Sequence, residues 1–127
     1  MLKEFKAVKQ HDNDLFRRWF EDDFFDLIVW YDAHQMICGF QLCYDKNRRE
    51  RAITWLESKG YAHDVIDSGE RSVWEVKSPT LAGATSFPHQ QVLEDFTLRS
   101  TEIDEEVAAY VKRKLEEYRE PDELRGL

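Results

Sequence analysis

The stretch FFDLIVWYDAHQMICGFQLCYD, residues 24–45, decides the fold. It consists of two apolar runs separated by a short polar break, and each run has the composition and length of a β-strand. The break is about four residues long, which is typical of a hairpin loop. Each run nevertheless contains one polar residue, Asp26 in the first and Gln41 in the second, and these two residues need an explanation.

Apolar runs separated by short polar breaks continue on both sides of this stretch and predict a series of neighbouring strands. The predicted strands are residues 2–8, 24–32, 36–45, 50–57, 61–67 and 72–77. Between the first two of them, residues 9–23 are interpreted as a polar connection with a hydrophobic anchor of Phe16, Trp19 and Phe20.

The last third of the chain has the pattern of a loop followed by two helices. Residues 78–87 contain Pro, Gly and small polar residues and predict the loop, and a proline suits the start of a helix over residues 88–99. A second helix is predicted over residues 101–118, where Thr101 and Asp104 resemble a capping box. Its apolar stripe consists of Ile103, Val107, Tyr110, Val111, Leu115 and Tyr118.

Strands followed by helices predict an α+β fold, an antiparallel β-meander of about four to six strands that two C-terminal helices pack on one face. At 127 residues and 42% hydrophobic composition, residues 1–127 are expected to form a single domain. Residues 1–77 are expected to be mainly β, residues 88–120 helical, and residues 121–127 a frayed tail.

The charge and the apolar patterning exclude several classes of partner. A net charge of −8 at pH 7 disfavours binding to nucleic acids, because their phosphate backbones are also negative. No apolar run approaches the roughly 20 residues that cross a bilayer, and the first residues lack the apolar segment of a signal peptide. We therefore expect no membrane partner and a cytoplasmic location, with Cys38 and Cys43 reduced because their spacing fits neither a redox motif nor a zinc-ligand pair.

One simple choice of hairpin registers places Asp26 and Gln41, the two polar residues within the apolar runs, next to each other on the sheet. If the first hairpin closes directly around its polar break, Asp26 lies opposite Gln41. The next two hairpins then place Gln41 opposite Thr54, and Thr54 opposite His63. These four side chains form one row on the open face, which is the side of the sheet that the helices leave uncovered. Register matters here because a slip of one residue moves every side chain to the opposite face.

Such a row predicts a pocket, since Gly39 leaves room beside it and Trp30 supplies an apolar wall. The predicted ligand-binding residues are Asp26, Gln41, Thr54, His63 and Trp30. The loop of residues 78–87 is a candidate lid. No metal site is predicted, because the histidines form no close ligand pair, and no cofactor is expected.

Three functions remain open. The first is the binding of a small molecule on the open face, and the second is an enzyme whose acid–base pair is Asp26 and His63. The third is a homodimer, because an open face that carries Ile28 and Trp30 is too apolar to leave in water. In a simpler alternative, Asp26 and Gln41 satisfy each other's hydrogen bonds without any ligand.

Two arginines precede Trp19 in the segment FRRWFEDD. A guanidinium beside a tryptophan can recognise a carboxylate or phosphate at the rim of a pocket. Alternatively, Arg17 and Arg18 pair with the acidic residues that follow them, which is the interpretation favoured here.

The motifs FDLIVWYD, GFQLCYDK and ERAITW together resemble a family of small, uncharacterised bacterial proteins, and the resemblance covers roughly the first half of the chain. It implies a soluble bacterial protein. It assigns no catalytic or binding residue, so the candidate site rests on the residue pattern alone.

Overall fold

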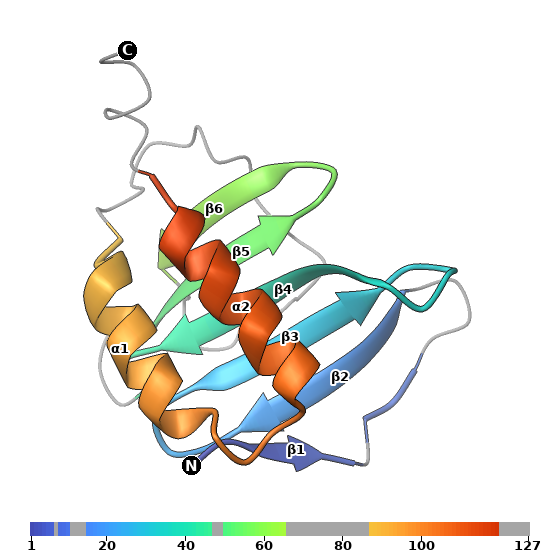
Figure 1. The fold of residues 1–127 in the computed structure, drawn as a ribbon, viewed down its shortest axis with the longest axis horizontal. Helices are drawn as coiled ribbons and strands as arrows, with labels where there is room; N and C mark the ends of the chain where they lie inside the picture. Colours follow the sequence, from blue (N-terminus) through green and yellow to red (C-terminus); the bar gives the residue numbers. More distant parts are fainter. Residues whose placement is uncertain (7, 11–14, 47–49, 66–86, 120–127) are drawn as a thin grey trace.

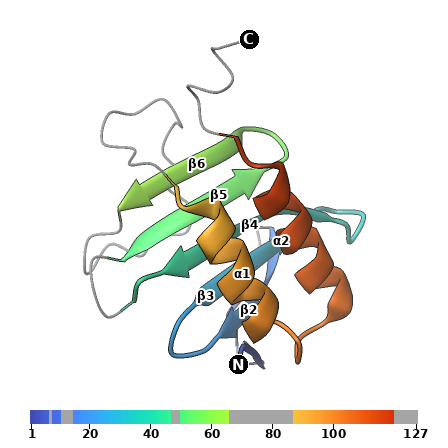
Figure 2. The ribbon, with the colours of Figure 1, turned by 60° about the vertical axis from the view of Figure 1, so that its left-hand side comes forward.

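The computed structural model describes residues 1–6, 8–10, 15–46, 50–65 and 87–119. Within these ranges six antiparallel strands form one sheet in chain order, and two helices lie on one of its faces (Figures 1 and 2). The elements are β1 (Lys3–Phe5), β2 (Phe16–Glu21), β3 (Asp26–Tyr31), β4 (Ile37–Tyr44), β5 (Arg51–Leu56), β6 (Gly60–Val65), α1 (His89–Arg99) and α2 (Glu105–Glu117). The predicted α+β fold, an antiparallel meander with two C-terminal helices on one face, is confirmed.

Both helices form close to where the sequence predicts them, and α2 shows why. Asp104 is its N-cap, and the Asp104 carboxylate accepts a hydrogen bond of 2.9 Å from the backbone N–H of Glu106. The predicted capping box with Thr101 is therefore wrong, because Asp104 itself satisfies a free N–H at the first turn. The buried residues of α2 repeat at helical spacing and face the sheet, as Val107, Val111 and Leu115 show.

The core lies between the helices and one face of the sheet. Alternate residues of each strand point into it, so that Leu27 and Val29 of β3 meet Leu42 and Phe40 of β4. All four of these side chains are fully buried. At about 25 cal/mol per Å² of apolar surface removed from water, such a layer supplies the main driving force for folding. The remaining alternate residues point to the open face, away from α1 and α2.

The segment predicted as a polar connection, residues 9–23, contains the strand β2. This prediction was wrong because Arg18 occupies a position that faces the core layer, opposite Val29. A charged residue at such a position hides the alternation of apolar and polar residues that identifies a strand. Arg18 is tolerated there because Glu4 and Asp104 neutralise its charge.

The first hairpin has a different register from the predicted one. Tyr31 pairs with Ile37, and a bulge then shifts the pairing, so that Asp26 lies opposite Cys43 and Ile28 opposite Gln41. The predicted opposition of Asp26 and Gln41 is therefore wrong by two residues. An even shift keeps each side chain on its predicted face, which explains why both residues still point to the open face.

The third hairpin is shifted by one residue, with larger consequences. Gly60 adopts a φ of +82°, pairs with Leu56 and closes a tight turn. His63 consequently lies opposite Ile53 on the core side, and Ala62 takes the predicted place opposite Thr54. An odd shift exchanges the two faces of a strand, so the predicted place of His63 in the row is wrong.

Three predicted segments fall wholly or mostly outside the described residues. They are the strand at residues 72–77, the candidate lid at residues 78–87, of which only Phe87 is described, and the tail at residues 121–127. At the other end of the chain, β1 is shorter than the strand predicted over residues 2–8.

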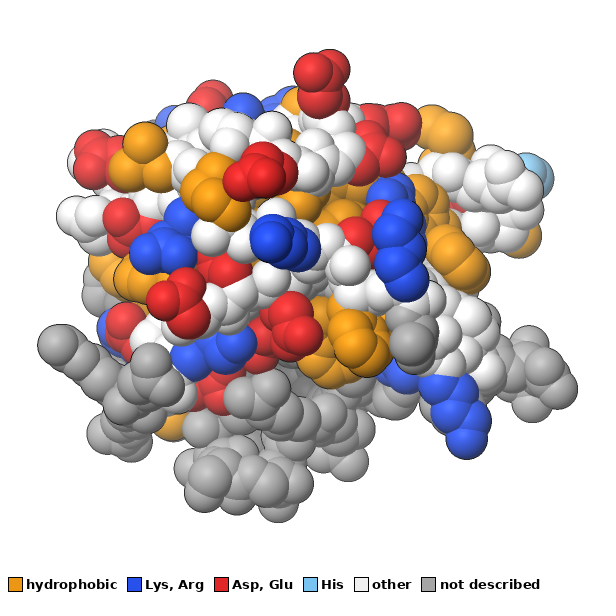
Figure 3. Space-filling model, turned by 90° about the horizontal axis from the view of Figure 1, so that it is seen from below, with side chains coloured by type: hydrophobic (Ala, Val, Ile, Leu, Met, Phe, Trp, Pro, Cys, Tyr) orange, Lys and Arg blue, Asp and Glu red, His pale blue; other side chains and the backbone are white. Residues whose placement is uncertain are grey.

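Charged side chains of both signs gather on the side of the molecule where β1 lies, with hydrophobic side chains between them (Figure 3). β1 is a terminal strand of the described sheet, so one of its edges faces away from β2. Its Glu4 is paired with Arg18 and lies 3.8 Å from the ammonium of Lys6. Charges along a sheet edge discourage pairing with strands of other molecules.

Candidate functional site

On the open face, Gln41 and Thr54 bond to each other. The register of β4 and β5 is as predicted and places them opposite one another. The Gln41 side-chain amide donates a hydrogen bond of 3.1 Å to the hydroxyl oxygen of Thr54. Thr54 is only 3% exposed. The pair satisfies part of its own hydrogen-bonding capacity, which is the arrangement expected for buried polar groups of structural origin.

Asp26 is held by a different partner, Lys46. The Lys46 ammonium lies 2.9 Å from the Asp26 carboxylate and also donates a hydrogen bond of 2.8 Å to the backbone carbonyl of Asp22. The Asp26 side chain is 3% exposed. Asp26 and Gln41 therefore do not satisfy each other, because Asp26 is bonded to Lys46 and Gln41 is bonded to Thr54.

His63 lies on the other side of the sheet, among aromatic rings of the core. Its ring stacks on Tyr44 at a centroid distance of 5.9 Å, and its Nε2 shares a hydrogen bond with the Tyr44 hydroxyl. The ring of Phe87 lies 5.0 Å away. The structure thus does not bring Asp26 and His63 together as an acid–base pair.

Gly39 does not leave room for a ligand beside the row. A methyl group built on Gly39 would lie 2.7 Å from both the Leu56 side chain and the backbone oxygen of Trp55. The absent side chain instead allows β4 and β5 to pack closely. Trp30, opposite Gly39, is 2% exposed. The predicted floor of a pocket is therefore made of buried, closely packed side chains together with the bonded pairs described above.

A hollow of about 490 Å³ opens elsewhere, on the helix side of the sheet. Its described lining residues are Phe16 and Arg18 of β2, Tyr31 at the end of β3, and Asp32 and Gln35 of the following turn. We call it the Arg18 hollow. The rings of Phe16 and Tyr31 form two of its walls, edge to face at a centroid distance of 5.7 Å. Phe16 is 54% exposed, which leaves much of its ring accessible to a ligand.

The turn between β3 and β4 is built by Asp32. One carboxylate oxygen of Asp32 accepts hydrogen bonds from the backbone N–H groups of His34 and Met36, at 2.8 and 3.1 Å. Within this turn Gln35 adopts a φ of +64°, a left-handed conformation that few residues other than glycine take. Side-chain capping by Asp32 stabilises such a turn and holds Gln35 at the rim of the hollow.

Arg18 binds three neighbours around the hollow. It donates two hydrogen bonds to the Glu4 carboxylate, at 2.7 and 3.0 Å, one to Asp104 at 3.1 Å and one to the Tyr31 hydroxyl oxygen at 3.0 Å. These contacts raise the pKa of Arg18, while hydrogen bonding from Arg18 lowers the pKa of Glu4 and of Asp104. The arginine joins β1, β2, β3 and the start of α2. Its partners, Glu4 and Asp104, are not the acidic residues that directly follow it in sequence.

Three groups in the Arg18 hollow keep hydrogen-bonding capacity within the described part of the chain. The Tyr31 oxygen accepts from Arg18, so its hydroxyl hydrogen is available to an acceptor. The second carboxylate oxygen of Asp32 and the side-chain amide of Gln35 have no partner among the described residues. These groups can orient a bound molecule. The sequence pattern identifies Phe16 only as part of the hydrophobic anchor in residues 9–23. The turn sequence DAHQM, residues 32–36, which Asp32 caps, is the sequence signal that could identify the rim of the Arg18 hollow.

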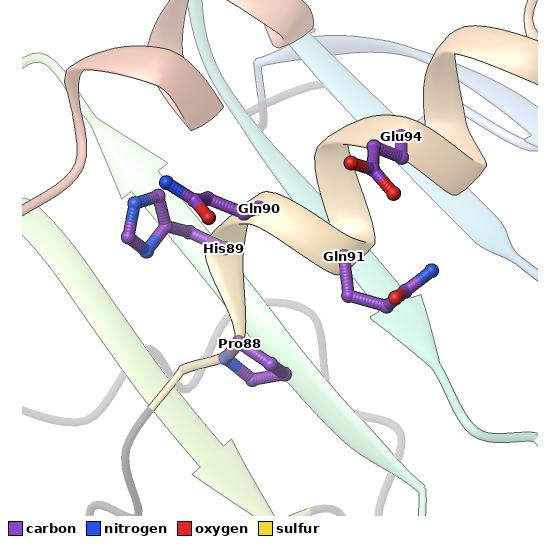
Figure 4. Close-up of a pocket in the computed structure, with 5 residues that line it drawn as sticks. All are labelled: Pro88, His89, Gln90, Gln91 and Glu94. Carbon is purple, nitrogen blue, oxygen red and sulfur yellow. The ribbon is translucent and has the colours of Figure 1, made fainter.

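A second hollow, of about 390 Å³, lies at the first turns of α1 (Figure 4). Its labelled side chains diverge, with His89 and Gln90 on one side of the helix and Gln91 on the other. A third, of about 400 Å³, shares His89 with it and reaches Arg119. A binding site needs polar groups that converge on one point, so these surfaces are weaker candidates than the Arg18 hollow.

No family model matches the chain, and comparison with curated proteins and with solved structures finds no significant similarity. The resemblance to a bacterial family therefore stays a prediction. Among the described residues, neither helix has the length and apolar character needed to cross a bilayer, and no cluster of three or more potential metal ligands is present.

Proposed function

We propose that the protein binds a small organic molecule and that the molecule occupies the Arg18 hollow. The observation that carries the proposal is the convergence of two aromatic walls with the spare hydrogen-bonding groups of Tyr31, Asp32 and Gln35 in one hollow of about 490 Å³. Small-molecule sites generally have a volume of roughly 300–1,000 Å³, mostly apolar walls and a few well-placed polar groups.

The open face gives less support to the same function. Asp26 and Thr54 are buried, and they are bonded to Lys46 and Gln41. A ligand there would have to replace these bonds, whereas a ligand in the Arg18 hollow would use hydrogen-bonding capacity of Tyr31, Asp32 and Gln35 that no described residue takes up. An enzyme with an Asp26–His63 pair has less support still, because the two side chains lie on opposite faces of the sheet.

Substitution of Phe16 tests the proposal. Fragments that bind the wild-type protein, detected by ligand-observed NMR, should bind Phe16→Ala at least tenfold more weakly, because the variant loses one aromatic wall. Stacking and burial against an aromatic ring contribute on the order of 1–3 kcal/mol. Phe16 is largely exposed, so the fold should survive the substitution with a small change in thermal stability.

Gln41→Ala is the matched control, because it removes a polar group from the predicted row on the open face. The affinity of the same fragments should remain unchanged in this variant. Loss of binding in Gln41→Ala together with full binding in Phe16→Ala would contradict the proposal and return the site to the open face.

A homodimer is a second candidate, favoured by one observation. Phe5 lies opposite Trp19 on the open face at the terminal strand β1 and is 47% exposed. Ile28 and Trp30, which prompted the dimer hypothesis, are already buried in the single chain. A cytoplasmic location and a bacterial source are also part of the proposal. The two free cysteines support the location, and the sequence resemblance supports the source.

A further inference from the structure

We infer that the molecule taken up by the Arg18 hollow is a small organic cation, an amine attached to an aromatic or aliphatic body. This inference rests on the proposed binding function and adds the charge of the ligand. Three features of the hollow carry it: the balance of charge around it, the engagement of most N–H groups of Arg18, the one cation in its described lining, and the groups that the hollow still offers.

The charge around the hollow is negative. The guanidinium of Arg18 faces the carboxylates of Glu4 and Asp104, at 2.7 and 3.1 Å. Asp32 adds a third carboxylate in the lining itself. Among the described residues, Arg18 and Lys6, whose ammonium lies 3.8 Å from Glu4, supply two positive charges against three negative charges, so a bound cation would bring the local charge nearer to balance. The electrostatic preference is reinforced by the net charge of −8 on the whole chain.

Arg18 is poorly placed to receive an anion. A guanidinium has five N–H groups, and four of those in Arg18 are already directed to Glu4, Asp104 and Tyr31. An anionic ligand would have to displace a carboxylate that forms a two-point contact with Arg18, and it would lie beside the negative Asp32. Within the described lining no other lysine or arginine is available to attract it.

The groups that remain suit an ammonium ion. The second carboxylate oxygen of Asp32 and the amide oxygen of Gln35 are acceptors, and an ammonium group has three donors and no acceptor. The exposed ring of Phe16 offers its negative face to a cation. The Tyr31 hydroxyl can bind an acceptor elsewhere on the ligand. An amine satisfies the acceptors of Asp32 and Gln35 together with the ring of Phe16, and a ligand that also carries an acceptor satisfies Tyr31.

A series of probes that share a phenylethyl body and differ in the terminal group tests the inference. The probes are 2-phenylethylamine, 2-phenylethanol and 3-phenylpropionate, measured at pH 7, where an alkylamine is protonated. The amine should bind at least tenfold more tightly than the alcohol, and the propionate more weakly than either. The amine should also lose affinity as the salt concentration rises, while the alcohol should not.

Asp32→Asn is the variant that separates charge from structure. An asparagine side-chain oxygen can still accept the two hydrogen bonds that Asp32 receives from the turn, so the turn is preserved. This variant should bind the amine at least fivefold more weakly and the alcohol with unchanged affinity. Equal affinities of the wild type and Asp32→Asn for the amine would overturn the inference.

The outcomes also separate this inference from the proposed function. If the alcohol or the propionate binds at least as tightly as the amine, and that binding is lost in Phe16→Ala, the cation inference is overturned while the small-molecule function stands. If none of the three probes binds the wild-type protein at millimolar concentration, both are overturned.

Discussion

Gly39→Ala is expected to lower the free energy of unfolding by about 2–3 kcal/mol, because it forces an atom into a filled space. The added methyl group would lie 2.7 Å from the backbone oxygen of Trp55 and 2.7 Å from a methyl carbon of Leu56. A side chain can rotate away, but a backbone oxygen in the middle of the sheet cannot move without disturbing the pairing of β4 and β5. The change is measured by urea unfolding at pH 7.

Gly60→Ala is the control for this prediction. A methyl group on Gly60 meets nothing within 4 Å, but the residue has a φ of +82°. Its cost should therefore be conformational only, about 1 kcal/mol. A Gly39→Ala variant that is no less stable than Gly60→Ala would show that β4 and β5 are not packed as closely as described here.

Arg18→Met is expected to cost about 2–3 kcal/mol at pH 7, because it leaves the carboxylates around Arg18 without their cation. Methionine keeps much of the apolar stem of the arginine, so the loss reports mainly on charge and hydrogen bonds. The Arg18 side chain is 22% exposed and that of Glu4 is 23% exposed, so solvent replaces only part of what is lost. Urea unfolding of both proteins measures the difference.

The same variant should respond less to acid. In the wild type, Arg18 holds the pKa of Glu4 below its ordinary 4.5 and that of Asp104 below its ordinary 3.8. A carboxyl group whose pKa is lowered by folding stabilises the protein above its ordinary pKa, and this contribution is lost as the pH falls through the folded-state value. The wild type should therefore lose stability as the pH falls below about 4.5, and the part of this loss that comes from the contacts of Arg18 with Glu4 and Asp104 should be absent in Arg18→Met.

Some acid sensitivity should remain in the variant because of Asp22. Burial raises the pKa of Asp22, but hydrogen bonds from the backbone of Phe25 and Phe24 and from Arg99 outweigh burial and bring the pKa below its ordinary value. Unfolding free energies of both proteins at pH 7 and below pH 4 give the comparison. An equal loss in the two proteins would contradict the role given to Arg18.

The sequence predicts the faces of the central strands more securely than their registers. The alternation in Leu27, Ile28 and Val29 defines two faces locally, and an even shift of register leaves them unchanged. Register depends on the turn geometry. The bulge beside Tyr31 and the left-handed φ of Gly60 each move the pairing, and neither can be derived from the apolar pattern alone.

The candidate site could be predicted less well than the fold, because it depends on contacts between distant residues. Arg18 pairs with Glu4, 14 residues before it, and with Asp104, 86 residues after it. These partners explain why a charged residue can face the core side in β2, but local sequence shows neither of them. The predicted row failed because the registers of two hairpins differ from the predicted ones, and local sequence also does not show that Lys46, from outside the strands of the row, binds Asp26.

The most direct test of the central claim is a map of backbone amide chemical shifts in the ¹⁵N-labelled wild-type protein during titration with a bound fragment. Binding in the Arg18 hollow predicts that the largest changes occur in residues 16–18 of β2 and residues 31–36 of the turn. Changes centred instead on Ile28, Gln41 and Thr54 would place the ligand on the open face and contradict the account.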